Sequence, residues 1–176
     1  MDILTFQVRD IQIDEERPAR AIRLEPELQG VAARQIPLGY PADRTRDTRA
    51  FTAEIRTEIF TFLRAWSRGA DEAALAVLAD VEDPDTGQQW TAVRLRAAAD
   101  AHRAGHGAMR FDPEARNLRH TYVTVADDGR TWRVEQMLID ADEHNDWVAA
   151  FAVDVAASRE AERPVLRLLR LGPLAP

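Results

Sequence analysis

The sequence contains neither cysteine nor lysine. The absence of cysteine excludes disulfides, thiolate nucleophiles and cysteine-ligated zinc or iron–sulfur centres. All 23 basic residues are arginines, so the chain also lacks the lysine of a Walker A motif and of Schiff-base enzymes. Its 8 glycines are scattered and form no phosphate-binding loop. We therefore expect no ATPase activity and no cofactor.

Long apolar runs are also missing. The longest, residues 147–153, is far shorter than the roughly 20 residues of a membrane-spanning helix, and Met1-Asp2-Ile3 lacks the basic start of a signal peptide. A composition of 45% hydrophobic and 30% charged residues is typical of a folded protein, and 176 residues suffice for one domain with an extension. The net charge of −7 argues against a general nucleic-acid binder. We expect a cytoplasmic protein with no membrane association.

The first 47 residues differ from the rest. Residues 3–13 alternate apolar and polar positions, with a slip at Arg9-Asp10, and so predict a strand with a bulge. Prolines and glycines then follow too closely for long regular elements, which predicts an extended arm with one short strand near residues 21–24. We therefore divide the chain into an N-terminal strand and arm (1–47) and a main domain (48–176).

Three helices are predicted at the start of the main domain. Asp47 or Thr48 can cap the first, which ends at Gly69 and has apolar residues at helical spacing on one face: Phe51, Ile55, Ile59, Phe62 and Trp66. A second, alanine-rich helix is expected over about 71–79. The third is expected from near Thr91 to about His102, with Gly105 and Gly107 ending it.

Beyond Gly107 the apolar spacing becomes that of strands. Strands are expected at 121–125, 130–139, 147–156 and 165–171, with Asp127-Asp128-Gly129 as a hairpin turn and 140–146 as an acidic loop. Helices followed by an antiparallel meander predict an α+β domain, in which three helices pack on a curved, cone-like sheet of about four strands.

Several short motifs carry a likeness to a known family. They are Arg49-Ala-Phe51, Asp112-Pro-Glu-Ala115-Arg116, Trp132-Arg-Val-Glu-Gln136-Met-Leu-Ile-Asp140, Asp146-Trp147 and Val153-Asp154-Val-Ala-Ala-Ser158. In their order and spacing they resemble the C-terminal domain of unknown function appended to actinobacterial superfamily II DEAD/DEAH-type helicases. The resemblance covers roughly 49–171 and implies a free-standing appendage without the motor. Its order of helices and strands is also similar to the nuclear-transport-factor-2-like fold, which hosts both enzymes and binding modules.

Polar residues on apolar strand faces form the candidate site. A polar group among apolar neighbours needs a partner or costs about 1–3 kcal/mol. One interpretation is that Gln136 and Asp154 bind a ligand between the sheet and the helices, with Trp132 or Trp147 as a wall. The other is that the two residues satisfy each other, or a buried arginine such as Arg116, and only set the strand register.

Three functions stay open at this point. The first is a non-catalytic interaction module, whose partner is an unidentified protein or small molecule, or a second copy bound through the sheet. The second is a cone-fold enzyme with Asp154 as general base and Gln136 or Tyr122 orienting the substrate. A closed apolar core would favour the module, and an open pocket at Asp154 the enzyme. The third is an RNA-binding accessory protein that uses arginine clusters near residues 17–23, 44–49 and 163–170.

Metal sites are not expected. Loop 140–146 has carboxylates at EF-hand spacing, but His144 and Asn145 stand where an oxygen ligand and glycine belong, and no glutamate occupies the twelfth position. His102 and His106 lie four residues apart, but Gly105 is expected to break the helix between them. A catalytic triad assembled from Ser158, Asp154 and a histidine (His120 or His144) lacks a nucleophile-elbow context.

Overall fold

The structure is a computed structural model that describes residues 43–83 and 86–174. The expected strand at 3–13, the short strand at 21–24 and the arm up to residue 42 lie outside the described residues. In chain order the elements are η1 (Arg44–Arg46), α1 (Thr48–Ser67), α2 (Asp71–Leu75), α3 (Ala92–His106), η2 (Leu118–His120), β1 (Thr121–Val125), β2 (Thr131–Leu138), β3 (Trp147–Asp154), α4 (Val155–Ala161) and β4 (Leu166–Pro173).

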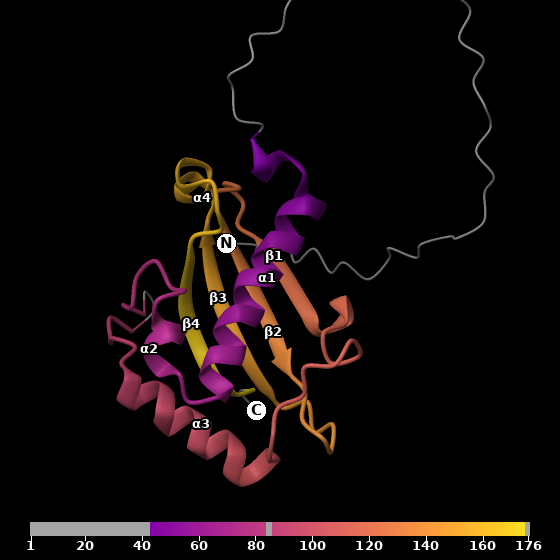
Figure 1. The fold of residues 1–176 in the computed structure, drawn as a ribbon. Helices are drawn as coiled ribbons and strands as arrows, with labels where there is room; N and C mark the ends of the chain where they lie inside the picture. The colour runs from indigo at the N-terminus through magenta and orange to yellow at the C-terminus, as the bar shows by residue number, and fades with distance from the viewer. Residues whose placement is uncertain (1–42, 84–85, 175–176) are drawn as a thin grey trace, which may run out of the picture. The chain divides into compact units, whose positions relative to one another are not determined.

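The four strands form one antiparallel sheet in the order β1-β2-β3-β4, and α1 lies across one face of it (Figure 1). This confirms the α+β class and the meander. The hairpin between β1 and β2 closes at Gly129, which has a φ of 65° and donates its N–H to the Ala126 carbonyl. None of the described helices is both long and apolar enough to cross a membrane.

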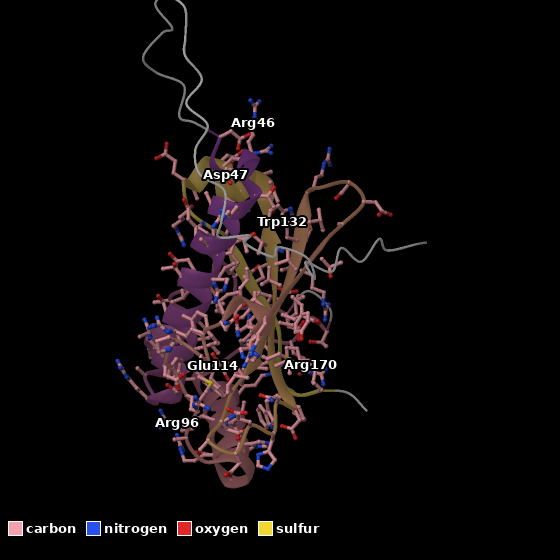
Figure 2. The ribbon with its side chains drawn as sticks, turned by 90° about the vertical axis from the view of Figure 1, so that its right-hand side faces the viewer. Arg46, Asp47, Arg96, Glu114, Trp132 and Arg170 are labelled. Carbon is pink, nitrogen blue, oxygen red and sulfur yellow. The ribbon has the colours of Figure 1, made fainter. Side chains whose placement is uncertain are left out.

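The first helix agrees with its prediction. Asp47 caps it by accepting a hydrogen bond from the Ala50 N–H at 3.0 Å. The predicted apolar face is buried. It packs on the side chains of β2 and β3 that point from the sheet toward α1. Phe51 meets Trp132 edge to face with ring centroids 5.2 Å apart, and Phe62 meets Phe151 at 5.5 Å. Figure 2 shows this helix and the sheet from the side.

The second and third helices differ from expectation in length. α2 ends at Leu75 and not near Ala79, because the chain there leaves the helix to pair with the sheet edge, where the Ala79 N–H donates to the Leu166 carbonyl at 2.9 Å. α3 continues through Gly105 to His106. A glycine inside a helix costs only about 1 kcal/mol relative to alanine, so it does not force an end. The helix stops at Gly107, where φ is 65°.

A fourth helix, α4, is missing from the sequence prediction. The third strand was expected to continue to Ala156, but it ends at Asp154, whose carboxylate accepts a hydrogen bond from the Ala157 N–H at 2.9 Å and so caps α4. The helix ends at Ala161 and is followed by Glu162, a non-glycine residue with a φ of 52°. The capping geometry therefore decides the boundary between strand and helix.

Candidate functional site

The space between α1 and the sheet is filled with side chains. Trp132 and Trp147 are buried, and Gln136 is fully buried among them. A hollow of about 280 Å³ lies elsewhere, between the end of α1, α3 and the following loop, and none of the expected pocket residues lines it. The two tryptophans are therefore core residues in this structure.

Gln136 belongs to a chain of hydrogen bonds that links β2 to α1. Its Oε1 accepts from the Thr121 hydroxyl at 2.7 Å, and its Nε2 donates to the Met137 carbonyl at 2.9 Å. The Arg56 Nε in turn donates to the Thr121 hydroxyl at 3.1 Å. Burial, followed by the nearby Arg116 guanidinium, lowers the pKa of Arg56. The buried amide is thus satisfied by a threonine and not, as one interpretation held, by Asp154.

Asp154 is the last residue of β3 and pairs with Thr131 at the start of β2. Gln136 lies near the other end of β2. Its side chain caps α4, and Ser158 of that helix donates to the Asp154 carbonyl while accepting from the Val165 N–H at 2.9 Å. The structure therefore does not bring Asp154 and Gln136 together. It gives both Asp154 and Ser158 hydrogen bonds within the α4 segment.

The two remaining candidates are Tyr122, which lies in β1, and Arg116, which precedes it. Tyr122 is 49% exposed. Arg116 precedes β1, and its carbonyl accepts a hydrogen bond from the Arg56 guanidinium. The Arg116 Nε is buried and has no hydrogen-bond partner among the described residues. Arg56 was not predicted, because nothing in the spacing of α1 distinguishes it from a solvent-exposed arginine.

The polar chain through Thr121 predicts a coupling between two residues. Thr121→Val and Gln136→Leu should each cost about 1–3 kcal/mol of unfolding free energy, because each leaves a buried partner unpaired. The double variant should cost less than the sum of the two. Chemical denaturation of all four proteins measures this, with exposed Thr131→Val as the matched control. Strictly additive costs would show that the two side chains do not interact.

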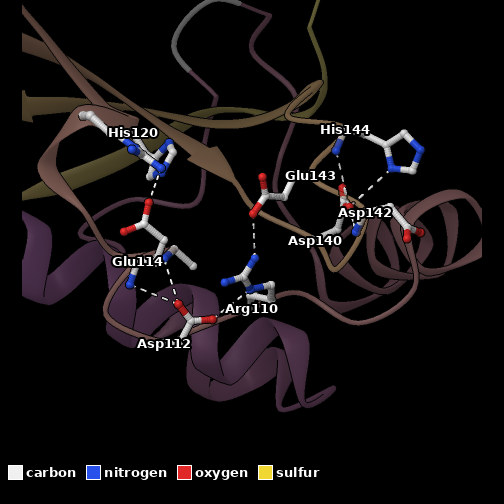
Figure 3. Close-up of polar contacts among 10 residues, drawn as sticks. Arg110, Asp112, Glu114, His120, Asp140, Asp142, Glu143 and His144 are labelled. Carbon is white, nitrogen blue, oxygen red and sulfur yellow. Dashed lines mark hydrogen bonds and ion pairs between the residues drawn. The ribbon is translucent and has the colours of Figure 1, made fainter.

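A second polar group lies near the end of the sheet where β2 runs into loop 140–146 (Figure 3). Arg110 bonds Asp112 at 2.8 Å and Glu143 at 3.0 Å, and so connects two loops distant in sequence. Asp112 also accepts from the Glu114 and Ala115 N–H groups. The Arg110 guanidinium and the Ala115 N–H lower the pKa of Asp112 to about 2.

The depressed pKa of Asp112 predicts an acid-dependent stability. The folded state binds the proton less readily than the unfolded chain, so this contribution is present above about pH 4 and is lost as the pH falls toward 2. Arg110→Ala should raise the pKa of Asp112 toward its ordinary value of 3.8, as followed by carboxyl NMR titration. Arg103→Ala, which removes a separate ion pair with Asp100, should leave it unchanged. An unshifted Asp112 in Arg110→Ala would contradict the assignment.

Histidines gather beside this group. Three of the chain's 4 histidines, His102, His106 and His144, lie together, because α3 runs one turn further than expected. The His102 and His106 rings stack at 5.2 Å, and the His144 ring meets that of His106 at 5.1 Å. Trp147 lies edge-on to His102 at 5.1 Å. Burial, followed by the neighbouring His106, lowers the pKa of His102.

Asp140 completes this cluster. It is 1% exposed, and its Oδ1 accepts from the Asp142 N–H at 2.8 Å and lies 3.3 Å from the His144 Nδ1. Burial opposes ionisation, but the N–H groups of Asp142 and His144 and the His144 ring outweigh it and lower the pKa of Asp140. One ligand atom from each of His106, Asp140 and His144 lies within 4.8 Å of the others. Among the residues that the structure describes, these three form the group that could hold a metal ion.

The face of the sheet opposite α1 presents another kind of surface. Tyr122, Glu135, Ala150 and Arg170 share one row of the register, and they alternate with the inward row that holds Gln136. The neighbouring row holds Arg133, Ala152 and Arg167, and Asp80 bridges to Arg167 at the edge. In β3, Ala150 of this face is 0% exposed and Ala152 is half-buried, and the exposed side chains belong to the flanking strands.

A family model, described as a domain of unknown function, DUF3516, matches residues 12–171. The match begins well before Arg49, where the quoted motifs start, and so includes most of the segment that those motifs leave uncovered. No curated protein and no solved structure matches the chain.

Proposed function

Since the chain belongs to the family of the domain of unknown function DUF3516, we propose that it is a non-catalytic interaction module that binds a protein partner through the outer face of its sheet. The partner we propose is a superfamily II DEAD/DEAH-type helicase motor, which the sequence motifs suggest. We propose residues 48–176 as the binding domain, residues 1–47 as its N-terminal arm, and the cytoplasm as its location.

The observation that carries this proposal is the filled interior. An enzyme or small-ligand binder of the cone type needs an open cavity with polar groups directed into it. Here the face of α1 occupies that position, since Phe51, Ile55 and Ile59 are each at most 1% exposed. The residues that such an enzyme would use are engaged elsewhere: Gln136 bonds Thr121, and Asp154 caps α4.

The outer face has the composition of an interface. Tyrosine, arginine and methionine are enriched where proteins bind one another, and arginine forks suit carboxylates on a partner. Tyr122 is exposed, Arg133 and Arg167 are exposed, and Met137 is half-buried in the same face. Arg133 is paired with Glu135 at 3.1 Å, which holds its guanidinium over the sheet.

This proposal predicts that charge reversal on the outer face weakens binding. A fluorescently labelled full-length chain should bind a purified DEAD/DEAH-type motor core, and the double variant Arg167→Glu with Arg170→Glu should weaken binding by about tenfold or more, as expected for interface arginines. Arg103→Glu, an exposed arginine of α3, should leave the affinity unchanged. Fluorescence anisotropy measures all three proteins.

Two results would count against the helicase partner. One is no binding to the motor core; the other is binding that the outer-face variant does not weaken. Single-stranded RNA serves as the competing probe, because an exposed tyrosine beside arginines on a sheet is also a surface on which bases stack. Tight RNA binding that falls steeply with salt and is lost in Tyr122→Ala would replace the protein partner by RNA.

A further inference from the structure

We propose that His106, Asp140 and His144 form a binding site for a divalent transition metal ion, with zinc as the ion that the ligand set fits best. Two imidazoles and one carboxylate are the ligands of zinc sites that keep a fourth position open. The sequence spacing does not suggest this set, because His106 comes from the last turn of α3, whereas Asp140 and His144 come from loop 140–146.

The hydrogen bonding of the His106 ring leaves one of its nitrogens available to a cation. Its Nε2 lies 2.7 Å from the Asp146 Oδ1. An ionised carboxylate only accepts hydrogen bonds, so Nε2 carries the proton and Nδ1 is left with a lone pair in the neutral ring. That Nδ1 is buried and has no hydrogen-bond partner among the described residues. A metal ion would satisfy the lone pair, and the Asp146 carboxylate would orient the ring as carboxylates orient histidine ligands elsewhere.

The distances suit a tetrahedral ion. Two ligand atoms that each lie about 2.0–2.1 Å from zinc are about 3.3 Å apart in a tetrahedral site. The Asp140 Oδ1 and the His144 Nδ1 are already 3.3 Å apart. Without metal the imidazole donates a hydrogen bond to the carboxylate there, and a bound ion would displace that proton, because a histidine binds metal as the neutral ring. The other separations do not exceed 4.8 Å, so each separation lies within about 1.5 Å of the spacing that a tetrahedral site requires.

The protein backbone fixes the carboxylate in advance. Asp140 lies two residues after the end of β2 and bridges to Met109, while the Arg110 N–H donates to the Ile139 carbonyl at 2.7 Å. Its Oδ1 is held by the Asp142 N–H. The buried rings of His102 and Trp147 pack against the His106 ring. Their burial lowers the local polarity, which strengthens the interaction between an ion and its ligands.

We expect this site to bind calcium much more weakly than zinc. Calcium takes six to eight oxygen ligands, whereas two of the three ligands here are imidazole nitrogens. The acidic loop therefore takes a different role from the EF-hand that its carboxylate spacing resembles: it supplies one oxygen, one nitrogen and the carboxylate that orients His106.

The test is a titration of the full-length chain, freed of metal by chelator, with zinc alone. Competition against a chromophoric chelator should give one ion per chain with a dissociation constant of about 10 µM or tighter, and cobalt should give the visible spectrum of a tetrahedral site. His144→Gln, whose side chain is 48% exposed and so should fold normally, should weaken zinc binding by at least about 100-fold, as should His106→Gln. Asp146→Asn should weaken it by about 10–100-fold.

The fourth histidine provides the matched control. His120→Gln lies outside the cluster and should leave zinc affinity unchanged. In thermal melting experiments, zinc should raise the melting temperature of the unmodified chain and of His120→Gln, but not that of His144→Gln. Zinc binding weaker than this limit, or equal binding by His144→Gln and the unmodified chain, would overturn the proposal, as would calcium binding with similar affinity.

Discussion

The packing of α1 against one face of the sheet is the constraint on which the rest of this structure depends. Its apolar stripe meets the inward side chains of β2 and β3, with aromatic pairs at Phe51–Trp132 and Phe62–Phe151. Because these side chains fill the interior, each polar group there needs a partner within the protein. Arg56, Thr121 and Gln136 supply one another's hydrogen bonds across three elements. The side chains that a partner could reach therefore lie on the outer face and at the ends of the sheet.

The antiparallel register then decides what meets at those ends. One end brings Asp154 to the start of α4, where its carboxylate is used as a cap. The other end brings loop 140–146 against the last turn of α3 and against the loop that holds Arg110 and Asp112. Trp147, the first residue of β3, joins the core to the histidine cluster, because its ring contacts His102. The fold thus concentrates ionisable groups away from its apolar centre.

Much of this architecture follows from local sequence patterns. The spacing of Phe51 to Trp66 predicts α1, and alternation with Asp127-Asp128-Gly129 predicts the β1–β2 hairpin, because one buried face dictates each pattern. The errors arise where tertiary contacts decide. α2 is short because Ala79 pairs with β4, and α4 begins where Asp154 changes from a strand residue to a cap. The histidine cluster was not predicted because Gly105 was expected to end α3. The helix continues through Gly105 and ends at Gly107, which has a positive φ. The hydrogen bond between Gln136 and Thr121 depends on the register of β1 against β2, which the pattern of either strand alone does not determine.

The interior between α1 and the sheet is closed, whereas the outer face carries exposed side chains such as Tyr122, and the absence of cysteine makes this difference directly measurable. Single cysteines introduced as Ala149→Cys, which points inward and is fully buried, and Tyr122→Cys, which is on the outer face, would be the only thiols in the chain. Their rates of labelling under native conditions report exposure at each position. The account predicts rapid labelling at 122 and labelling at 149 only at the rate of unfolding. Rapid labelling at 149 in a folded variant would show an open cavity between α1 and the sheet, and would contradict it.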